Sequence, residues 1–98
     1  MMNSAVGELG LRLICRPELF TLMDYDKEHT SELYRSLRVF LKWERSIARA
    51  CEELNVHRTT LLYRMQRIDQ LTHLNLDDEK VRLELILSYR LLEREKYS

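Results

Sequence analysis

Two helical patterns meet at a short turn within residues 47–67, which read IARACEELNVHRTTLLYRMQR. Helices that cross steeply at such a turn need a small side chain where they approach, and a turn residue that tolerates left-handed dihedral angles. Cys51 is the predicted small residue, and Asn55 is the common non-glycine choice for a positive φ. The apolar contacts expected on both sides of the turn are Val56, Ile47 and Leu61.

The whole chain is expected to form one compact all-α domain of about five helices. Ninety-eight residues rarely divide into two cores, and two glycines with one proline leave little to build hairpins with. Apolar residues recur at a spacing of three and four, and strand alternation is absent. A weaker helical pattern covers residues 7–15. The five main helices are expected to begin at Pro17, after a cap at Thr30 or Ser31, after a cap at Ser46, near Arg58 and after a cap at Asp77, and to end near Asp24, Trp43, Leu54, Thr72 and Glu93.

Positive charge is concentrated in the middle of the chain. Sixteen basic residues balance sixteen acidic ones overall, yet residues 35–76 carry eight basic against four acidic. Seven of the eight are arginine, whose planar guanidinium suits phosphate groups and guanine edges. Charge alone leaves two interpretations open, a nucleic-acid surface and an ordinary solvated helical face.

The predicted helix over residues 58–70 has one apolar and one polar side. Its buried stripe is expected to contain Leu61, Met65 and Ile68. Asp69 is its only acid, so the polar side could enter a DNA major groove without a row of carboxylates repelling phosphates. An ordinary helix hairpin remains the alternative. The polar side is formed by Thr59, Tyr63, Gln66, Arg67 and Gln70, with Arg58 and Arg64 at its flanks.

Three strings in sequence, SIARACEEL, VHRTTLLYRMQRIDQLTHLNLDD and VRLELILSYRLL, closely resemble the C-terminal helix-turn-helix domain of PucR/CdaR-type transcriptional regulators. The upstream string MDYDKEHTSELYRSLRVFL also resembles the segment before the motif in that family. The resemblance covers residues 20–95. It implies a helix-turn-helix domain over residues 20–98 behind a helical extension over residues 1–19. It further implies sequence-specific binding to double-stranded DNA by a bacterial-type regulator, with a recognition helix in the major groove.

The resemblance and the helical pattern together define the expected DNA-binding residues. Arg58 is expected to meet base edges, and Arg49 to contact backbone phosphate. The sequence departs from the family pattern where Thr59 replaces an asparagine and Leu62 replaces an arginine, so base recognition is expected to differ. The full set is Ser46, Arg49, His57, Arg58, Thr59, Thr60, Leu62, Tyr63, Arg64, Gln66 and Arg67.

No catalytic residues, metal site or cofactor are predicted. The chain has neither a phosphate-binding glycine loop nor a nucleophile elbow, and its acidic run at residues 77–79 suits a helix start. Its histidines, His29, His57 and His73, are far apart and are not grouped with the cysteines at ligand spacing. No small-molecule site is identified either.

Two cysteines without a CxxC pair favour a reducing cytoplasm. Cys51 is expected to be an inert core residue. Charges interrupt every apolar run before the roughly 20 residues that a membrane span needs, so no membrane association is expected.

The rival hypothesis is a helical protein-interaction or dimerisation module without DNA affinity. The last predicted helix has two apolar stripes, of which one can face the core. The other either packs against the helices before Trp43 or forms a two-fold homodimer that matches two operator half-sites. The stripes are Val81, Leu85 and Leu92 on one side, and Leu83, Leu87 and Leu91 on the other.

Overall fold

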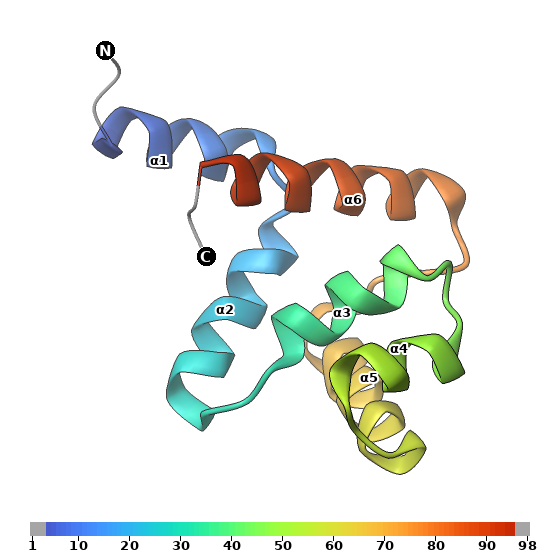
Figure 1. Cartoon of the computed structure of the whole chain (residues 1–98). Helices are drawn as coiled ribbons and strands as arrows, with labels where there is room; N and C mark the ends of the chain where they lie inside the picture. Colours follow the sequence, from blue (N-terminus) through green and yellow to red (C-terminus); the bar gives the residue numbers. More distant parts are fainter. Residues whose placement is uncertain (1–3, 96–98) are drawn as a thin grey trace.

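The computed structural model describes residues 4–95 and contains six α-helices and no strand within that range (Figure 1). The predicted all-α fold is therefore confirmed, and the weak pattern near the N-terminus is a sixth helix. The helices are α1 (Ser4–Ile14), α2 (Pro17–His29), α3 (Leu33–Lys42), α4 (Ile47–Leu54), α5 (Arg58–Thr72) and α6 (Glu79–Arg94).

Helix α3 is the centre of the fold and contacts α2, α4, α5 and α6. The main core joins α1, α2, α3, α5 and α6 through fully buried side chains such as Leu19, Leu37 and Tyr89. A second cluster, of Val39, Ala50, Leu54 and Leu61, holds α4 and α5 against α3. Figure 1 shows α1 beside α6 at one end of the molecule and α4 with α5 at the other. The apolar core thus fixes α4 and α5 as one rigid unit.

Helix α2 is longer than the sequence predicts, because it ends at His29 rather than near Asp24. No glycine or proline interrupts residues 24–29, so the backbone hydrogen bonds continue. Lys27 and His29 lie in the last turn, where cations favour the negative end of the helix dipole. Thr30 then stops the helix in the left-handed conformation, with φ 50° and ψ 48°.

The prediction that Thr30 or Ser31 caps α3 is wrong. The carboxylate of Asp26 accepts hydrogen bonds from the backbone N–H groups of Leu33, at 2.9 Å, and Tyr34, at 3.0 Å. Ser31 itself donates to the same carboxylate. A side chain of α2 therefore satisfies two free N–H groups of α3, which is the role usually taken by the residue directly before a helix.

The start of α6 also differs by one residue from the prediction. Asp78 is the cap, and its carboxylate accepts a hydrogen bond from the Lys80 N–H at 2.9 Å. Asp77 instead forms a 3.0 Å ion pair with Arg45, which lies in the loop between α3 and α4. Asp78 is thus the residue with extended dihedral angles directly before α6, which is the position of a cap.

The two apolar stripes of α6 have different surroundings. Leu85 and Leu92 are fully buried, and Val81 packs against the same core. On the other stripe, Leu91 is half-buried, but Leu83 and Leu87 remain more than half exposed. The second stripe therefore does not pack against the helices before Trp43 at these two positions.

The loop from α3 to α4 contains two consecutive residues with positive φ, Glu44 at 53° and Arg45 at 68°. This conformation costs a non-glycine residue roughly 1–2 kcal/mol. Replacing Glu44 by glycine is expected to raise the free energy of unfolding by about 0.5–1 kcal/mol, since relief of the strain exceeds the lost chain entropy. Urea denaturation of Glu44→Gly beside Glu44→Ala measures the effect. Alanine keeps the Cβ, so an equal gain in both variants would contradict a backbone origin.

Candidate nucleic-acid interface

Helices α4 and α5 are joined by the turn that the sequence predicts. Ser46 caps α4, with its hydroxyl accepting a hydrogen bond from the Arg49 N–H at 3.2 Å. Asn55 ends α4 in the left-handed conformation, at φ 57° and ψ 49°. The Val56 N–H then donates to the Cys51 carbonyl at 3.1 Å, and α5 begins two residues later. The local chemistry of these residues fixes the angle at which α5 leaves α4.

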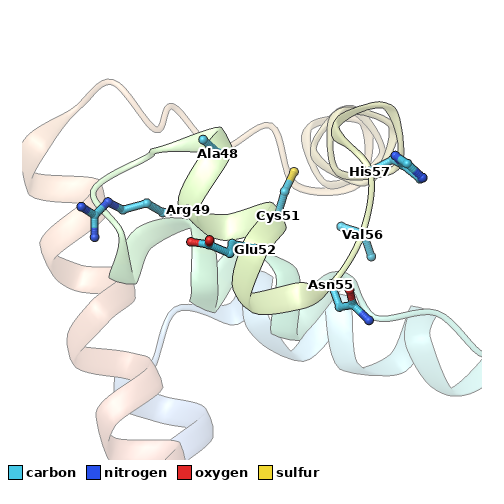
Figure 2. A pocket seen from close by; sticks show the side chains of 7 residues that line it. All are labelled: Ala48, Arg49, Cys51, Glu52, Asn55, Val56 and His57. Atoms are coloured by element: carbon cyan, nitrogen blue, oxygen red, sulfur yellow. The ribbon is translucent and has the colours of Figure 1, made fainter.

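Two small side chains of α4 lie at the packed side of the motif, the predicted Cys51, which packs against the second cluster, and Ala50. Ala50 is fully buried together with Leu61 of α5 and Val39 of α3. Cys51 is half-buried and lines an open hollow of about 580 Å³ at the turn. Figure 2 shows Cys51 projecting from α4 toward α5, while the His57 side chain extends to the opposite side of the turn, away from Cys51. The hollow is lined by Ala48, Arg49, Cys51, Glu52, Asn55, Val56 and His57.

Helix α5 presents one face to the protein and another to solvent. Leu61 and Ile68 are buried, and Met65 is half-buried against both clusters, as the helical pattern predicts. On the other side, Leu62 is 42% exposed and Tyr63 is 57% exposed. The exposed residues on this face are Arg58, Thr59, Leu62, Tyr63, Gln66 and Gln70. We call this set the α5 face.

The structure brings most of the expected DNA-binding residues to the α4–α5 surface. Arg49 on α4 and His57 at the turn are exposed, as are all the expected residues on the α5 face. Ser46 and Thr60 are half-buried, and the Ser46 hydroxyl is engaged as the α4 cap. The surface therefore combines both ends of the turn with the outer side of α5.

Arg64 lies differently from the other arginines of α5. Its Nη1 donates a 3.0 Å hydrogen bond to Ser36, a fully buried residue of α3, and lies 3.9 Å from a carboxylate oxygen of Glu32. Only 20% of the Arg64 side chain is exposed. This arginine holds α5 against α3, and the structure does not bring it onto the α5 face.

Arg67 is oriented by its neighbours on α5. Its guanidinium donates hydrogen bonds to the Tyr63 hydroxyl at 3.1 Å and to the Gln70 side-chain oxygen at 3.0 Å. The hydrogen bond to Tyr63 raises the pKa of Arg67 above its ordinary value. The cation also lies 5.7 Å from the centre of the Tyr63 ring. Arg67 is thus a fixed positive charge at the edge of the α5 face.

Most other bases of the cationic segment are neutralised by nearby acids. Arg38 pairs with Glu93 at 2.7 Å, and Lys42 pairs with Glu53 at 3.0 Å. Arg35, Arg45 and Arg64 also lie within ion-pair distance of a carboxylate. Within residues 4–95, the three bases of this segment without a carboxylate partner are Arg49, Arg58 and Arg67. All three belong to α4 and α5, so the unbalanced positive charge is at the candidate interface.

Trp43 supports this interface although the sequence did not identify it. The Arg49 guanidinium lies 5.2 Å from the centre of the Trp43 ring, and Lys42 lies 5.3 Å from it. The ring nitrogen donates to Glu53 at 2.8 Å. Hydrogen bonds from Lys42 and then Trp43 lower the pKa of Glu53. A single tryptophan among cations is the sequence signal, but only the folded turn brings Arg49 to it.

Helices α4 and α5 form a helix-turn-helix, and arginines without a carboxylate partner around it are typical of a DNA-binding domain of a transcription regulator. The family model of the PucR C-terminal helix-turn-helix domain matches residues 33–91, from α3 into α6. The chain belongs to this family. The predicted assignment is thereby confirmed, together with its class, DNA-binding transcription regulation.

Two curated relatives from Bacillus subtilis (strain 168) are similar to the chain. It is 31% identical over 77 residues to the proline-responsive transcriptional activator PutR, and 30% identical over 73 residues to the DNA-binding transcriptional activator AdeR. The matches cover 79% and 74% of this chain but only 19% and 17% of those proteins. The chain thus spans less than a fifth of the length of the curated relatives it matches. No solved structure matches it.

Two other kinds of site, a membrane span and a metal centre, have no counterpart in the described residues. None of the helices within residues 4–95 is long and apolar enough to cross a membrane. The same residues include no group of three or more His, Cys, Asp or Glu side chains that could hold a metal ion. Both cysteines are free thiols, and burial raises the pKa of Cys15.

Proposed function

We propose that the chain binds a duplex operator sequence-specifically, with α5 in the major groove. The observation that carries this proposal is the distribution of unpaired charge, since Arg49, Arg58 and Arg67 all lack a carboxylate partner in the described residues. A cation without an internal partner can neutralise phosphate without first breaking an ion pair. Family membership and the activators to which the chain is similar give independent support.

The residues of the site divide by their expected contacts. Arg58 lies in the first turn of α5, where helix-turn-helix side chains meet base edges, and its guanidinium can form two hydrogen bonds with guanine. Arg67 lies more than two turns further along and contacts backbone phosphate in this proposal. Arg64 acts through its bond to Ser36 and positions α5. The remaining polar contacts are Thr59 and Gln66 toward bases, and Ser46, Arg49, His57 and Thr60 toward phosphates.

Methylation interference on a bound duplex tests the groove that α5 enters. The duplex is enriched from a random pool by the 98-residue chain. Methylation of guanine N7 blocks a major-groove acceptor, whereas methylation of adenine N3 blocks a minor-groove acceptor. We expect guanine methylation to prevent binding at the contacted positions and adenine methylation to have little effect. The reverse pattern, or failure to enrich any duplex, would contradict the proposal.

The proposed function also bears on the cellular location of the chain. A transcription regulator of this kind acts where bacterial DNA is found, so we assign the chain to the cytoplasm and attribute no catalytic activity to it.

The division into an extension over residues 1–19 and a domain over residues 20–98 also remains a proposal. Leu11 of α1 and Cys15, which follows α1, are buried in the main core, so the extension contributes to the stability of the domain.

We also propose that two copies of the chain associate through α1 and α6, which lie side by side (Figure 1). Five large apolar side chains on these helices are more than half exposed. Together they expose on the order of 500–600 Å² of apolar surface, against about 800 Å² per partner in a standard interface. A polar rim can supply the difference, and a two-fold pair would match two half-sites. The five residues are Leu9, Leu13, Ile14, Leu83 and Leu87.

Analytical ultracentrifugation tests this association. We expect dimers at high micromolar concentration, and at least a roughly tenfold weaker association in the double variant Leu13→Glu/Leu87→Glu, because two buried carboxylates per copy would lose hydration. Leu62→Glu/Tyr63→Glu is the matched control, since it adds the same two negative charges on α5 and should leave the association unchanged. A chain that stays monomeric at the highest concentration would contradict self-association.

A further inference from the structure

Leu62 is an apolar side chain in the middle of the polar α5 face. It is 42% exposed and belongs to neither core cluster. The described residues contain seven exposed large apolar side chains, of which five lie on α1 and α6 and the other two are Leu62 and Tyr63. Tyr63 is explained by its hydrogen bond to Arg67. Leu62 is apolar and joins neither core cluster of residues 4–95, so α5 presents it to whatever α5 binds.

We propose that Leu62 selects a thymine in the operator half-site through the thymine 5-methyl group. This inference rests on the proposed function, because it requires α5 in the major groove. The thymine methyl is the apolar group that a base pair presents there, whereas the other edges are hydrogen-bond donors and acceptors. A leucine packed on those polar edges would remove their water without replacing its hydrogen bonds. Leu62 therefore favours thymine and disfavours the other bases at the position it meets.

The position of Leu62 relative to Arg58 defines the spacing of the recognised bases. The two residues are four apart in α5, so both lie on its outer side, separated by about 6 Å along the helix axis. Successive bases of one strand are about 3.4 Å apart along the duplex. Because α5 crosses the groove at an angle to the duplex axis, a thymine at Leu62 lies within about two base pairs of a guanine at Arg58. The expected half-site thus contains a guanine and a thymine at this spacing.

Substitution of deoxyuridine for thymidine tests the contact, since it removes the methyl group and leaves base pairing unchanged. The probe is the duplex enriched by the full chain, with each thymidine replaced in turn, and fluorescence anisotropy gives the affinity. Burial of one methyl group corresponds to a change of about fourfold in affinity. We expect one uracil position in each half-site to weaken binding by about this factor. In Leu62→Ala, the same duplex pair should bind with equal affinity.

Thr21→Ala is the control, because Thr21 is an exposed residue on α2, outside both the α5 face and the proposed dimer surface, and its variant should keep the uracil effect. Circular dichroism verifies that both variants fold, as expected for side chains outside the core. If the parent binds with salt-dependent affinity but no uracil weakens it, the thymine contact is overturned while the proposed function stands. A uracil effect that persists in Leu62→Ala would overturn the role of Leu62. If no duplex is enriched, both fail together.

Discussion

Arg58→Ala is expected to weaken binding to the enriched duplex by about 1–3 kcal/mol, or roughly 5- to 150-fold. Arg58 is exposed in the first turn of α5 and has no carboxylate partner within residues 4–95, so its guanidinium group is available to bind a guanine edge. The variant should also discriminate less between the guanine position and other bases. Fluorescence anisotropy on the enriched duplex and on its single-base variants measures both effects.

Two other arginines serve as comparisons for this result. Arg67→Ala is expected to weaken enriched and unrelated duplexes alike, because a phosphate contact has no sequence preference. Arg94→Ala removes the same charge near the end of α6 and should bind like the parent. Equal losses in Arg58→Ala and Arg94→Ala would mean that overall charge, and not a base contact, determines the affinity.

Ala50→Leu is expected to lower the free energy of unfolding by about 1–3 kcal/mol. Ala50 is fully buried between α4, α5 and α3, so three additional carbon atoms must displace Leu61 or Val39. Ala48→Leu is the matched control, because Ala48 is an exposed residue of α4 that lines the open hollow, so a longer side chain can extend into it. Urea denaturation of the two variants compares them directly. A neutral Ala50→Leu would mean that the helices do not cross at this residue.

The α4–α5 turn could be predicted from the sequence because its determinants are local. Ser46 caps the helix that follows it, and Asn55 adopts the left-handed conformation that its side chain tolerates. The apolar spacing of Leu61 and Ile68 also fixes the inner side of α5. Each of these features depends only on residues within a turn or two of the helix.

Features that depend on distant contacts could not be predicted in this way. The rotation of α4 about its axis buries Ala50 fully and Cys51 only partly, and it is fixed by packing against Val39 of α3. Arg64 turns inward because Ser36, 28 residues earlier, offers a buried hydroxyl. Apolar periodicity gives the side of a helix to within about a residue, whereas these contacts require the tertiary structure.

The capping of α3 by Asp26 also depends on the tertiary structure and not on local preference. The sequence offers Thr30 and Ser31 at the usual capping positions, and both are reasonable from local preference. The fold instead places the Asp26 carboxylate against the N–H groups of Leu33 and Tyr34, seven and eight residues later. The N–H groups at the start of α3 are thus satisfied by a side chain of α2.

The salt dependence of DNA affinity tests the central claim most directly. Neutralisation of two to three phosphates by Arg49, Arg67 and the α5 terminus predicts an affinity that falls by about 10- to 50-fold between about 50 and 200 mM salt. The triple variant Arg49→Ala/Arg58→Ala/Arg67→Ala should lose both most of the affinity and most of this slope while retaining its helical circular dichroism. An affinity independent of salt, or a triple variant that binds like the parent, would contradict DNA binding through α4 and α5.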